Sequence, residues 1–156
     1  MFVVRYIKDT DIVSLKKFLK SYQQSDENYF CWIPEKIRGE LPLNNHIGVF
    51  EDGDMIGMCT IRQDKYLQGK YNTTAVLLSD VYINKEKRGQ GRGSKLVNRA
   101  VELAQEKYPN CDIYLSIIEL KIRPFYEKLG FEFIGSGKMR RTNNDVQSAQ
   151  RKKSRK

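Results

Sequence analysis

Residues 81–97 of the 156-residue chain have the sequence VYINKEKRGQGRGSKLV, and this stretch decides the fold. Residues 74–83, which lead into it, are apolar and rich in branched side chains, so they predict the strongest strand of the chain. After it, apolar residues recur at helical spacing to about Tyr108: Leu96, Val97, Ala100, Leu103 and Ala104. The glycines between them therefore predict a tight connection from a buried strand into an amphipathic helix.

We call residues 88–94 (RGQGRGS) the glycine turn. Glycines at alternate positions allow a tight bend and leave successive backbone N–H groups open, because no Cβ stands in the way. The helix that follows adds its own unpaired N–H groups and the positive end of its dipole. Arg88, Arg92 and Lys95 are expected to add full positive charges beside them. The segment therefore predicts a pocket for a pyrophosphate group.

Two other phosphate-binding motifs do not fit the glycine turn. A P-loop requires the spacing G-x-x-x-x-G-K-[ST], which GQGRGSK lacks. A dinucleotide fingerprint requires G-x-G-x-x-G, but Gly93 comes one residue too early and the chain is too short for the usual second half. A tight strand-to-helix turn without any ligand is the remaining alternative.

The stretch resembles the acetyl-CoA-binding motif of the GNAT superfamily of N-acetyltransferases, whose pattern is [RQ]-x-x-G-x-[GA]. In this chain the pattern falls on Arg88, Gly91 and Gly93. A second block, residues 123–135 (RPFYEKLGFEFIG), is similar to the late helix and strand of that family. The resemblance covers residues 74–135 well and the first half of the chain only in outline.

The resemblance implies an α/β fold with a central, mostly antiparallel mixed sheet, a V-shaped splay between two strands and helices on both faces. It also implies acetyl-CoA as co-substrate, with pantetheine lying in the splay like an extra strand. Its partners would be the backbone groups of Val81, Tyr82 and Ile83, one of whose N–H groups would polarise the thioester carbonyl. The pyrophosphate would bind at Arg88, Gly89, Gln90, Gly91, Arg92, Gly93 and Ser94. The side chains of Val81 and Ile83 are expected to serve the core.

The same resemblance assigns two candidate catalytic residues. Tyr126 occupies the position of the tyrosine that protonates the departing thiolate, and a phenol can donate to a thiolate in place. Asp80 lies on the strand before the glycine turn, where some relatives carry a general base. The alternatives are that Tyr126 packs as core beside Phe125, that Asp80 is structural, and that water removes the proton. In some relatives the acid falls one residue earlier, at the position of Ser79 here.

Two positions depart from the family pattern. Glu119 stands where many relatives have asparagine, and Ile122 stands where they often have a small alanine. Both positions lie near the cofactor in the family. An acyl group larger than acetyl is therefore an open alternative.

The rest of the chain predicts one domain, residues 1–141, followed by a basic tail, residues 142–156. Strands are expected at 2–7, 46–50, 55–62, 112–118 and 131–134, and helices after Asp9 and at 124–129. The sequence Glu51-Asp52-Gly53-Asp54 predicts a hairpin. Residues 63–72 are expected to form a polar loop, and apolar residues become scarce after Met139.

The composition limits the cellular compartments in which the protein is expected and the kinds of catalytic or metal site that it can form. Three scattered cysteines and a single histidine, His46, offer no disulfide framework, no zinc site and no histidine-dependent nucleophile. There is no apolar run of the roughly 20 residues that a membrane helix needs. The first residues lack the pattern of a signal peptide. We therefore expect a cytoplasmic protein that binds no metal.

Charge is uneven along the chain. Residues 23–54 carry seven acidic groups against two basic ones, which favours a cationic acceptor: a small amine, a lysine side chain or a protein N-terminus. Residues 138–156 carry eight basic groups against one acidic group, which suggests contact with RNA, DNA or ribosomes. The sequence thus predicts direct acetyl transfer in a ternary complex. The alternatives are a nucleic-acid-binding protein on the same scaffold and an enzyme that acetylates an amine carried on RNA.

Overall fold

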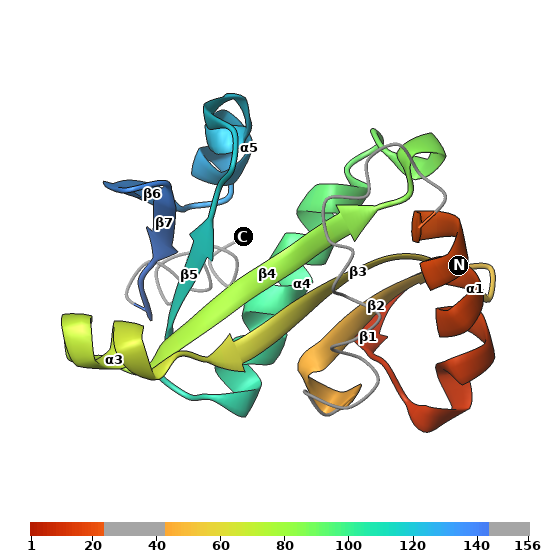
Figure 1. The fold of residues 1–156 in the computed structure, drawn as a ribbon, viewed down its shortest axis with the longest axis horizontal. Coiled ribbons are helices and arrows are strands. Elements are labelled where there is room, and N and C mark those ends of the chain that lie inside the picture. The colour runs from red at the N-terminus through yellow and green to blue at the C-terminus, as the bar shows by residue number, and fades with distance from the viewer. Residues whose placement is uncertain (24–42, 144–156) are drawn as a thin grey trace, which may run out of the picture. The chain divides into compact units, whose positions relative to one another are not determined.

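The computed structural model describes residues 1–23 and 43–143. The described strands form a seven-stranded, mostly antiparallel sheet in the order β1-β2-β3-β4-β5-β7-β6, which confirms the expected α/β class (Figure 1). The chain divides into two compact units, and strand β4 (Ala75–Ile83) and helix α4 (Arg92–Lys107) contribute residues to both. The glycine turn connects these two elements.

The first unit comprises Met1–Ile61 and Asp80–Ala100. Its other elements are β1 (Phe2–Tyr6), α1 (Ile12–Gln23), β2 (His46–Glu51) and most of β3 (Asp54–Gln63). Strands β1 and β2 pair antiparallel, as do β2 and β3. Asp52 and Gly53 join β2 to β3 with φ angles of 52° and 88°, which is the left-handed backbone that a two-residue hairpin favours. The predicted hairpin is confirmed.

The core of the first unit lies on both faces of its strands. One cluster joins α1 to the strands and contains Ile7, Leu15, Phe18, Tyr22, Phe50, Met55, Met58 and Tyr82. Ile47 and Cys59, which pair across β2 and β3, point to the opposite face, because neighbouring strand residues alternate, and both are fully buried. The helix α4 contributes a buried stripe to this unit: Leu96, Val97 and Ala100.

The second unit comprises Arg62–Ser79 and the chain from Val101 onward. Its other elements are α3 (Lys65–Tyr71), β5 (Asp112–Ser116), α5 (Arg123–Lys128), β6 (Glu132–Gly135) and β7 (Lys138–Arg141). Strands β4 and β5 pair in parallel from Ala75↔Asp112 to Leu77↔Tyr114. This ladder ends early in β4, which has nine residues. A short ladder of this kind is the feature expected of a splayed sheet.

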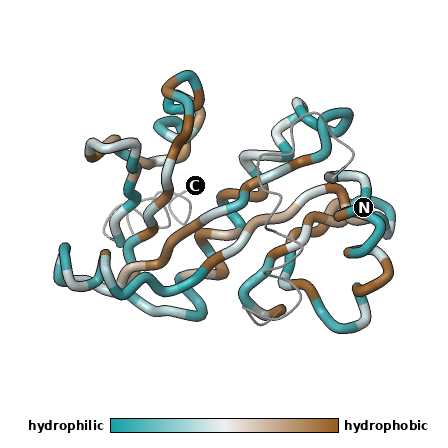
Figure 2. Tube along the Cα trace, viewed as in Figure 1, coloured by the Kyte–Doolittle hydropathy of each residue, from teal (hydrophilic) through white to brown (hydrophobic). Residues whose placement is uncertain are grey.

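The prediction of a polar loop over residues 63–72 is wrong, because α3 forms there. Asp64 caps this helix by accepting a hydrogen bond from the backbone N–H of Leu67 (3.0 Å). The helix is largely hydrophilic (Figure 2), yet Leu67 is buried with Ala75 and Tyr114. The ring of Tyr71 stacks on that of Tyr114, with 5.2 Å between centroids. Packing against the sheet therefore stabilises a helix that its own sequence indicates only weakly.

One strand was not predicted, because the last strand expected from the sequence covers residues 131–134. Lys138–Arg141 form β7, which lies between β5 and β6 and pairs antiparallel with both. Met139 is fully buried. The basic residues Lys138, Arg140 and Arg141 therefore belong to the sheet, and residues 144–156 lie outside the described part of the chain.

Candidate functional site

Strand β4 brings Asp80 into the first unit in an unusual backbone conformation. Its φ angle is 58°, in the left-handed region that aspartate tolerates better than most residues, and its side chain is 6% exposed. The thiol of Cys59 lies near this carboxylate. Burial, together with the negative charge of Asp80, raises the pKa of that thiol well above its ordinary value. Asp80 is thus a buried acid on strained backbone, a combination that occurs at functional sites.

Residues 81–83 follow Asp80 and pack closely against β3. The backbone N–H of Asn84 donates to the carbonyl oxygen of Ile56 (2.8 Å). A Cβ added to Gly57 would lie 2.6 Å from the carbonyl oxygen of Tyr82, so only glycine fits there. The ring of Tyr82 packs edge-on against that of Tyr22, with 4.6 Å between centroids. The end of β4 is therefore held rigidly within its unit.

The glycine turn has three successive residues in the left-handed region. The φ angles are 81° for Gly89, 59° for Gln90 and 74° for Gly91. Among the described residues beyond its chain neighbours, nothing lies within 4 Å of a Cβ built on either glycine. Gln90 has a side chain, and its conformation costs on the order of 1 kcal/mol. The turn is thus a strained loop that leaves room for a ligand.

The helix α4 starts directly after this loop and supplies further donors. Its first intrahelical hydrogen bond runs from the N–H of Lys95 to the carbonyl oxygen of Gly91 (3.0 Å). Helix geometry therefore leaves the N–H groups of Arg92, Gly93 and Ser94 without an acceptor inside the helix. Open N–H groups at the positive end of a 16-residue helix, next to a glycine loop, suit a phosphate or pyrophosphate. The residues present fit the group that the sequence predicted.

The side chains of Arg88 and Arg92, which were expected to add positive charge beside the turn, contact protein groups. The Nε of Arg88 donates to the carbonyl oxygen of Ile83 (2.9 Å), and its guanidinium lies 5.2 Å from the ring centroid of Tyr82. The guanidinium of Arg92 binds Glu51 through Nε (3.2 Å) and Nη2 (2.7 Å). Both side chains are occupied by protein groups, so the donors that the turn offers a ligand are chiefly backbone N–H groups.

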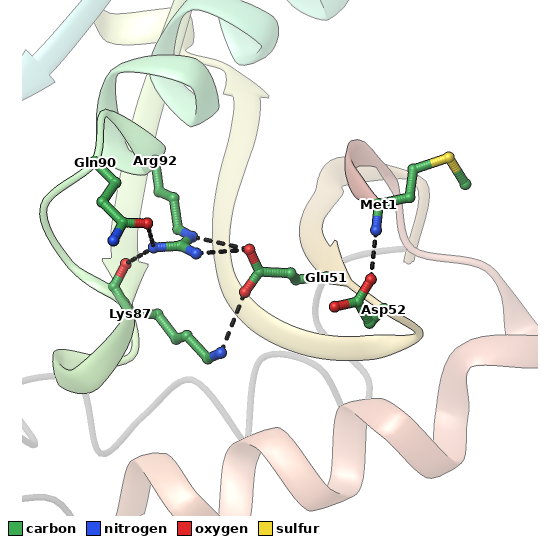
Figure 3. Close-up of polar contacts among 6 residues, drawn as sticks. All are labelled: Met1, Glu51, Asp52, Lys87, Gln90 and Arg92. Carbon is green, nitrogen blue, oxygen red and sulfur yellow. Dashed lines mark hydrogen bonds and ion pairs between the residues drawn. The ribbon is translucent and has the colours of Figure 1, made fainter.

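Glu51 is the residue of this site that sequence reasoning missed. It is the last residue of β2, and its carboxylate is 18% exposed. One carboxylate oxygen accepts from Arg92 and the other lies 3.2 Å from the ammonium of Lys87 (Figure 3). The hydrogen bond from Arg92, followed by that from Lys87, lowers the pKa of Glu51 below its ordinary value. Only the folded chain brings this acid to the turn.

The acidic segment is also organised differently from the expectation. Glu51 pairs with the glycine turn, Asp52 contacts the terminal ammonium of Met1, and Asp54 lies 3.9 Å from the ammonium of Lys17. These three carboxylates therefore face cations of the same unit. The other four acids of the segment, Asp26, Glu27, Glu35 and Glu40, lie outside the described residues.

Tyr126 belongs to the second unit, whereas Asp80, residues 81–83 and the glycine turn belong to the first. It is 6% exposed in α5, and its ring lies edge-on to those of Phe125 (5.0 Å) and Phe131 (5.8 Å). This aromatic packing fixes the orientation of the ring.

The two departures from the family pattern also lie in the second unit. Glu119 pairs with Lys121 (3.0 Å), and Ile122 is 41% exposed. An isoleucine is therefore partly solvent-facing at the position where a small residue was expected.

Three further observations concern the remaining sequence predictions. His46 is buried, and its Nδ1 lies 3.0 Å from the hydroxyl of Thr60. Within residues 1–23 and 43–143, no group of three or more His, Cys, Asp or Glu side chains is arranged to hold a metal ion. Among the helices of the described chain, none has the length and apolar character needed to cross a bilayer.

Comparisons with known proteins agree with this geometry. Residues 10–131 match the model of the acetyltransferase (GNAT) family. The chain is 29% identical over 91 residues to a probable spermine N(1)-acetyltransferase of Bacillus subtilis subsp. natto, a match that covers 57% of this chain. The matched segment spans 60% of that relative's length.

Solved structures show the same fold at low sequence identity. An acyl-CoA N-acyltransferase from Pseudomonas aeruginosa is 18% identical with a TM-score of 0.67, and the match covers 91% of this chain and 99% of that one. The PaiA N-acetyltransferase from Thermoplasma acidophilum, solved in complex with coenzyme A, is 20% identical with a TM-score of 0.62. That match also covers 91% of this chain and 99% of the other.

Proposed function

The chain belongs to the acetyltransferase (GNAT) family, and on this premise we propose that it transfers an acetyl group from acetyl-CoA to an amine. The observation that carries the proposal is the glycine turn. Three left-handed residues open its backbone, and the free N–H groups of α4 follow at once. Coenzyme A carries a pyrophosphate, which is the ligand that such a turn suits.

Acetyl-CoA would bind along the path from β4 to α4. The N–H groups of residues 89–94 would receive the pyrophosphate. The backbone of Val81, Tyr82 and Ile83 would receive the pantetheine, because β4 extends beyond its ladder with β5. One N–H group of this segment would stabilise the negative charge that develops on the thioester oxygen.

The chemistry needs one new bond and the removal of two protons from the acceptor. The acceptor binds as an ammonium ion and attacks after losing one proton to Asp80 or to water. Its nitrogen bonds to the carbonyl carbon while the carbon–sulfur bond breaks. In the proposed mechanism the hydroxyl of Tyr126 protonates the departing thiolate and then recovers the second proton of the amine. The products are the amide, free coenzyme A and one proton released to solvent.

The acceptor is proposed to be a small cationic amine of the polyamine class. The relative from Bacillus subtilis subsp. natto is named for spermine, and the matched segment covers part of each chain. Residues 24–42 carry more acidic than basic groups: Asp26, Glu27, Glu35 and Glu40 against Lys36 and Arg38. Negative charge of this kind favours a polycation over a neutral amine.

The test is an acetyl-transfer assay with acetyl-CoA and three acceptors: spermine, a lysine peptide and a peptide with a free N-terminus. Release of free coenzyme A is followed, and the acetylated product is identified by mass. The proposal expects turnover with spermine well above the other two. Turnover only with a peptide would move the acceptor to a protein. Acetyl-CoA binding without turnover on any amine, together with retention on RNA, would favour a binding protein on this scaffold.

A further inference from the structure

We infer that Glu51 is a positioning residue for the acyl-CoA site, which holds the glycine turn in the conformation that receives the pyrophosphate. The inference rests on the proposed function for the identity of the ligand. It assigns a role to a residue of the β2–β3 hairpin, outside the sequence motif itself. The support comes from the contacts around the turn.

Glu51 ties together the residues on either side of the three left-handed residues, Gly89 to Gly91. Lys87 precedes the left-handed residues and Arg92 follows them, and each binds a different oxygen of the carboxylate (Figure 3). Arg92 extends the network, because its Nη1 donates to the carbonyl oxygen of Lys87 (3.1 Å) and to the side-chain oxygen of Gln90 (3.0 Å). The guanidinium of Arg92 thus links Lys87, which lies before the turn, to Gln90 within it.

The turn needs such support because its own packing supplies little. Within residues 1–23 and 43–143, no atom beyond the chain neighbours lies within 4 Å of a Cβ built on Gly89 or Gly91. Gln90 is a residue with a Cβ in the left-handed region. Arg92 holds the Gln90 side chain, and Glu51 holds Arg92. A conformation that is costly by itself is therefore kept by side-chain hydrogen bonds to charged groups, which are stronger than neutral ones.

A positioning role for Glu51 and a simple charge effect predict opposite changes in the affinity for acetyl-CoA when Glu51 is substituted. A carboxylate near an anion site repels the ligand, so removing its charge alone should tighten acetyl-CoA binding. Loss of the clamp should weaken binding, because the competent turn becomes a smaller fraction of the population. The sign of the change in affinity therefore separates the two explanations.

The experiment compares Glu51→Gln with Asp52→Asn in the full chain. Both substitutions remove one negative charge from the same hairpin, and Asp52 is 80% exposed with no contact to the turn among the contacts drawn in Figure 3. We expect Glu51→Gln to raise the Kd for acetyl-CoA about tenfold. The KM for acetyl-CoA should rise by the same factor with kcat changed less than about twofold. Asp52→Asn should leave the Kd within about twofold.

A cycle with Arg92→Met tests whether Glu51 acts through that residue. The Glu51→Gln, Arg92→Met double variant should bind acetyl-CoA no more weakly than the weaker single variant, because one network is lost in either case. Additive losses would overturn the inference. So would unchanged or tighter binding by Glu51→Gln, or an equal loss in Asp52→Asn.

Backbone order parameters of residues 88–93, measured by NMR without ligand, separate this inference from the proposed function. Rigid backbone has values of about 0.85 and flexible backbone lies below about 0.6. Glu51→Gln should lower the values in the turn while Asp52→Asn leaves them unchanged. If the wild-type protein fails to bind acetyl-CoA, the proposed function is wrong, and the order parameters still decide whether Glu51 holds the turn.

Discussion

The hairpin at Asp52-Gly53 and the glycine turn share a left-handed backbone conformation but serve different purposes. Both have successive residues with positive φ, two in the hairpin and three in the turn. The hairpin joins two paired strands, so its flanking residues, Glu51 and Asp54, enter a ladder. The glycine turn joins a strand to a helix, so the N–H groups that follow it stay open. Left-handed residues make a bend, and the element that follows decides whether the bend can bind a ligand.

The glycine turn also depends on a residue next to the hairpin. Glu51 ends the strand that enters the hairpin, and its carboxylate holds the glycine turn. The regular turn is fixed by backbone pairing, whereas the irregular turn is fixed by side chains. We therefore expect substitutions at Asp52 and Gly53 to leave acetyl-CoA binding unchanged and substitutions in the glycine turn to weaken it.

The largest effect is expected at a residue outside both turns. Tyr126→Phe should lower kcat by about 10², because general acid catalysis by one side chain contributes at least that factor. The Kd for acetyl-CoA should stay unchanged, which would sharpen the assignment of binding to the glycine turn. Tyr66→Phe is the matched control, since Tyr66 is a tyrosine of the same unit with 71% exposure. Equal turnover in wild type and Tyr126→Phe would remove Tyr126 from the mechanism.

Gly57 lies within strand β3, where glycine is required by close packing and not by a turn. Gly57→Ala should destabilise the protein by about 1–3 kcal/mol, because the new Cβ meets the backbone of Tyr82 at 2.6 Å. Thermal unfolding should show a fall in Tm of several degrees. Gly69→Ala in α3 is the control: nothing lies within 4 Å of its Cβ position, and alanine favours a helix, so its Tm should rise slightly. A Tm for Gly57→Ala at or above that of wild type would contradict this packing.

The pH dependence of stability should report the Glu51 clamp. The pKa of Glu51 is lowered in the folded protein, so its contribution is present above the unfolded pKa of about 4.5. That contribution is lost as the pH falls through the lowered folded value. The Tm of Glu51→Gln should lie below that of wild type at pH 7, and the two should converge once the pH has fallen below the lowered pKa of Glu51. A constant difference across this range would show that the charge of Glu51 does not stabilise the fold.

The smallest effect on catalysis is expected from the C-terminal residues. Deletion of residues 144–156 spares the hydrogen bond from the N–H of Asn143 to Asp112 (2.7 Å). We expect unchanged acetyl-CoA affinity and unchanged turnover on spermine. Retention on an RNA column should fall and lose part of its salt dependence, because five basic residues are removed. Loss of turnover on spermine would place these residues in the acceptor site.

Local signals predicted part of this molecule well. The Asp-Gly pair predicted the hairpin, and the apolar stripe of α4 predicted the helix that follows the glycine turn. In both cases the determining residues are neighbours in sequence. The positive φ angles of Gly89 and Gly91 follow from the same local chemistry.

The features that sequence reasoning missed depend on distant residues. Helix α3 is stabilised by the stack of Tyr71 on Tyr114. Strand β7, Lys138–Arg141, contains one apolar residue, so its own sequence does not indicate a strand, and it is stabilised by pairing with a strand on each side. The contact between Glu51 and Arg92 joins residues 41 positions apart. Its place in the glycine turn predicted that Arg92 lies beside the pyrophosphate, and the structure adds that its guanidinium pairs with Glu51. A local sequence pattern cannot predict contacts between residues so far apart in the chain.

The central claim is that the glycine turn binds acetyl-CoA, and thermal unfolding of wild type, Gly53→Ala and Gly91→Ala tests it most directly. Both glycines have positive φ, and in the described part of the chain no atom beyond their neighbours lies within 4 Å of the Cβ position, so both variants should lose similar stability without ligand. Acetyl-CoA at about 100 times its Kd should stabilise wild type by roughly 2.7 kcal/mol, a rise of several degrees. At the same concentration Gly53→Ala should show the full rise and Gly91→Ala a clearly smaller one. An equal rise in both variants, or none in wild type, would contradict the account.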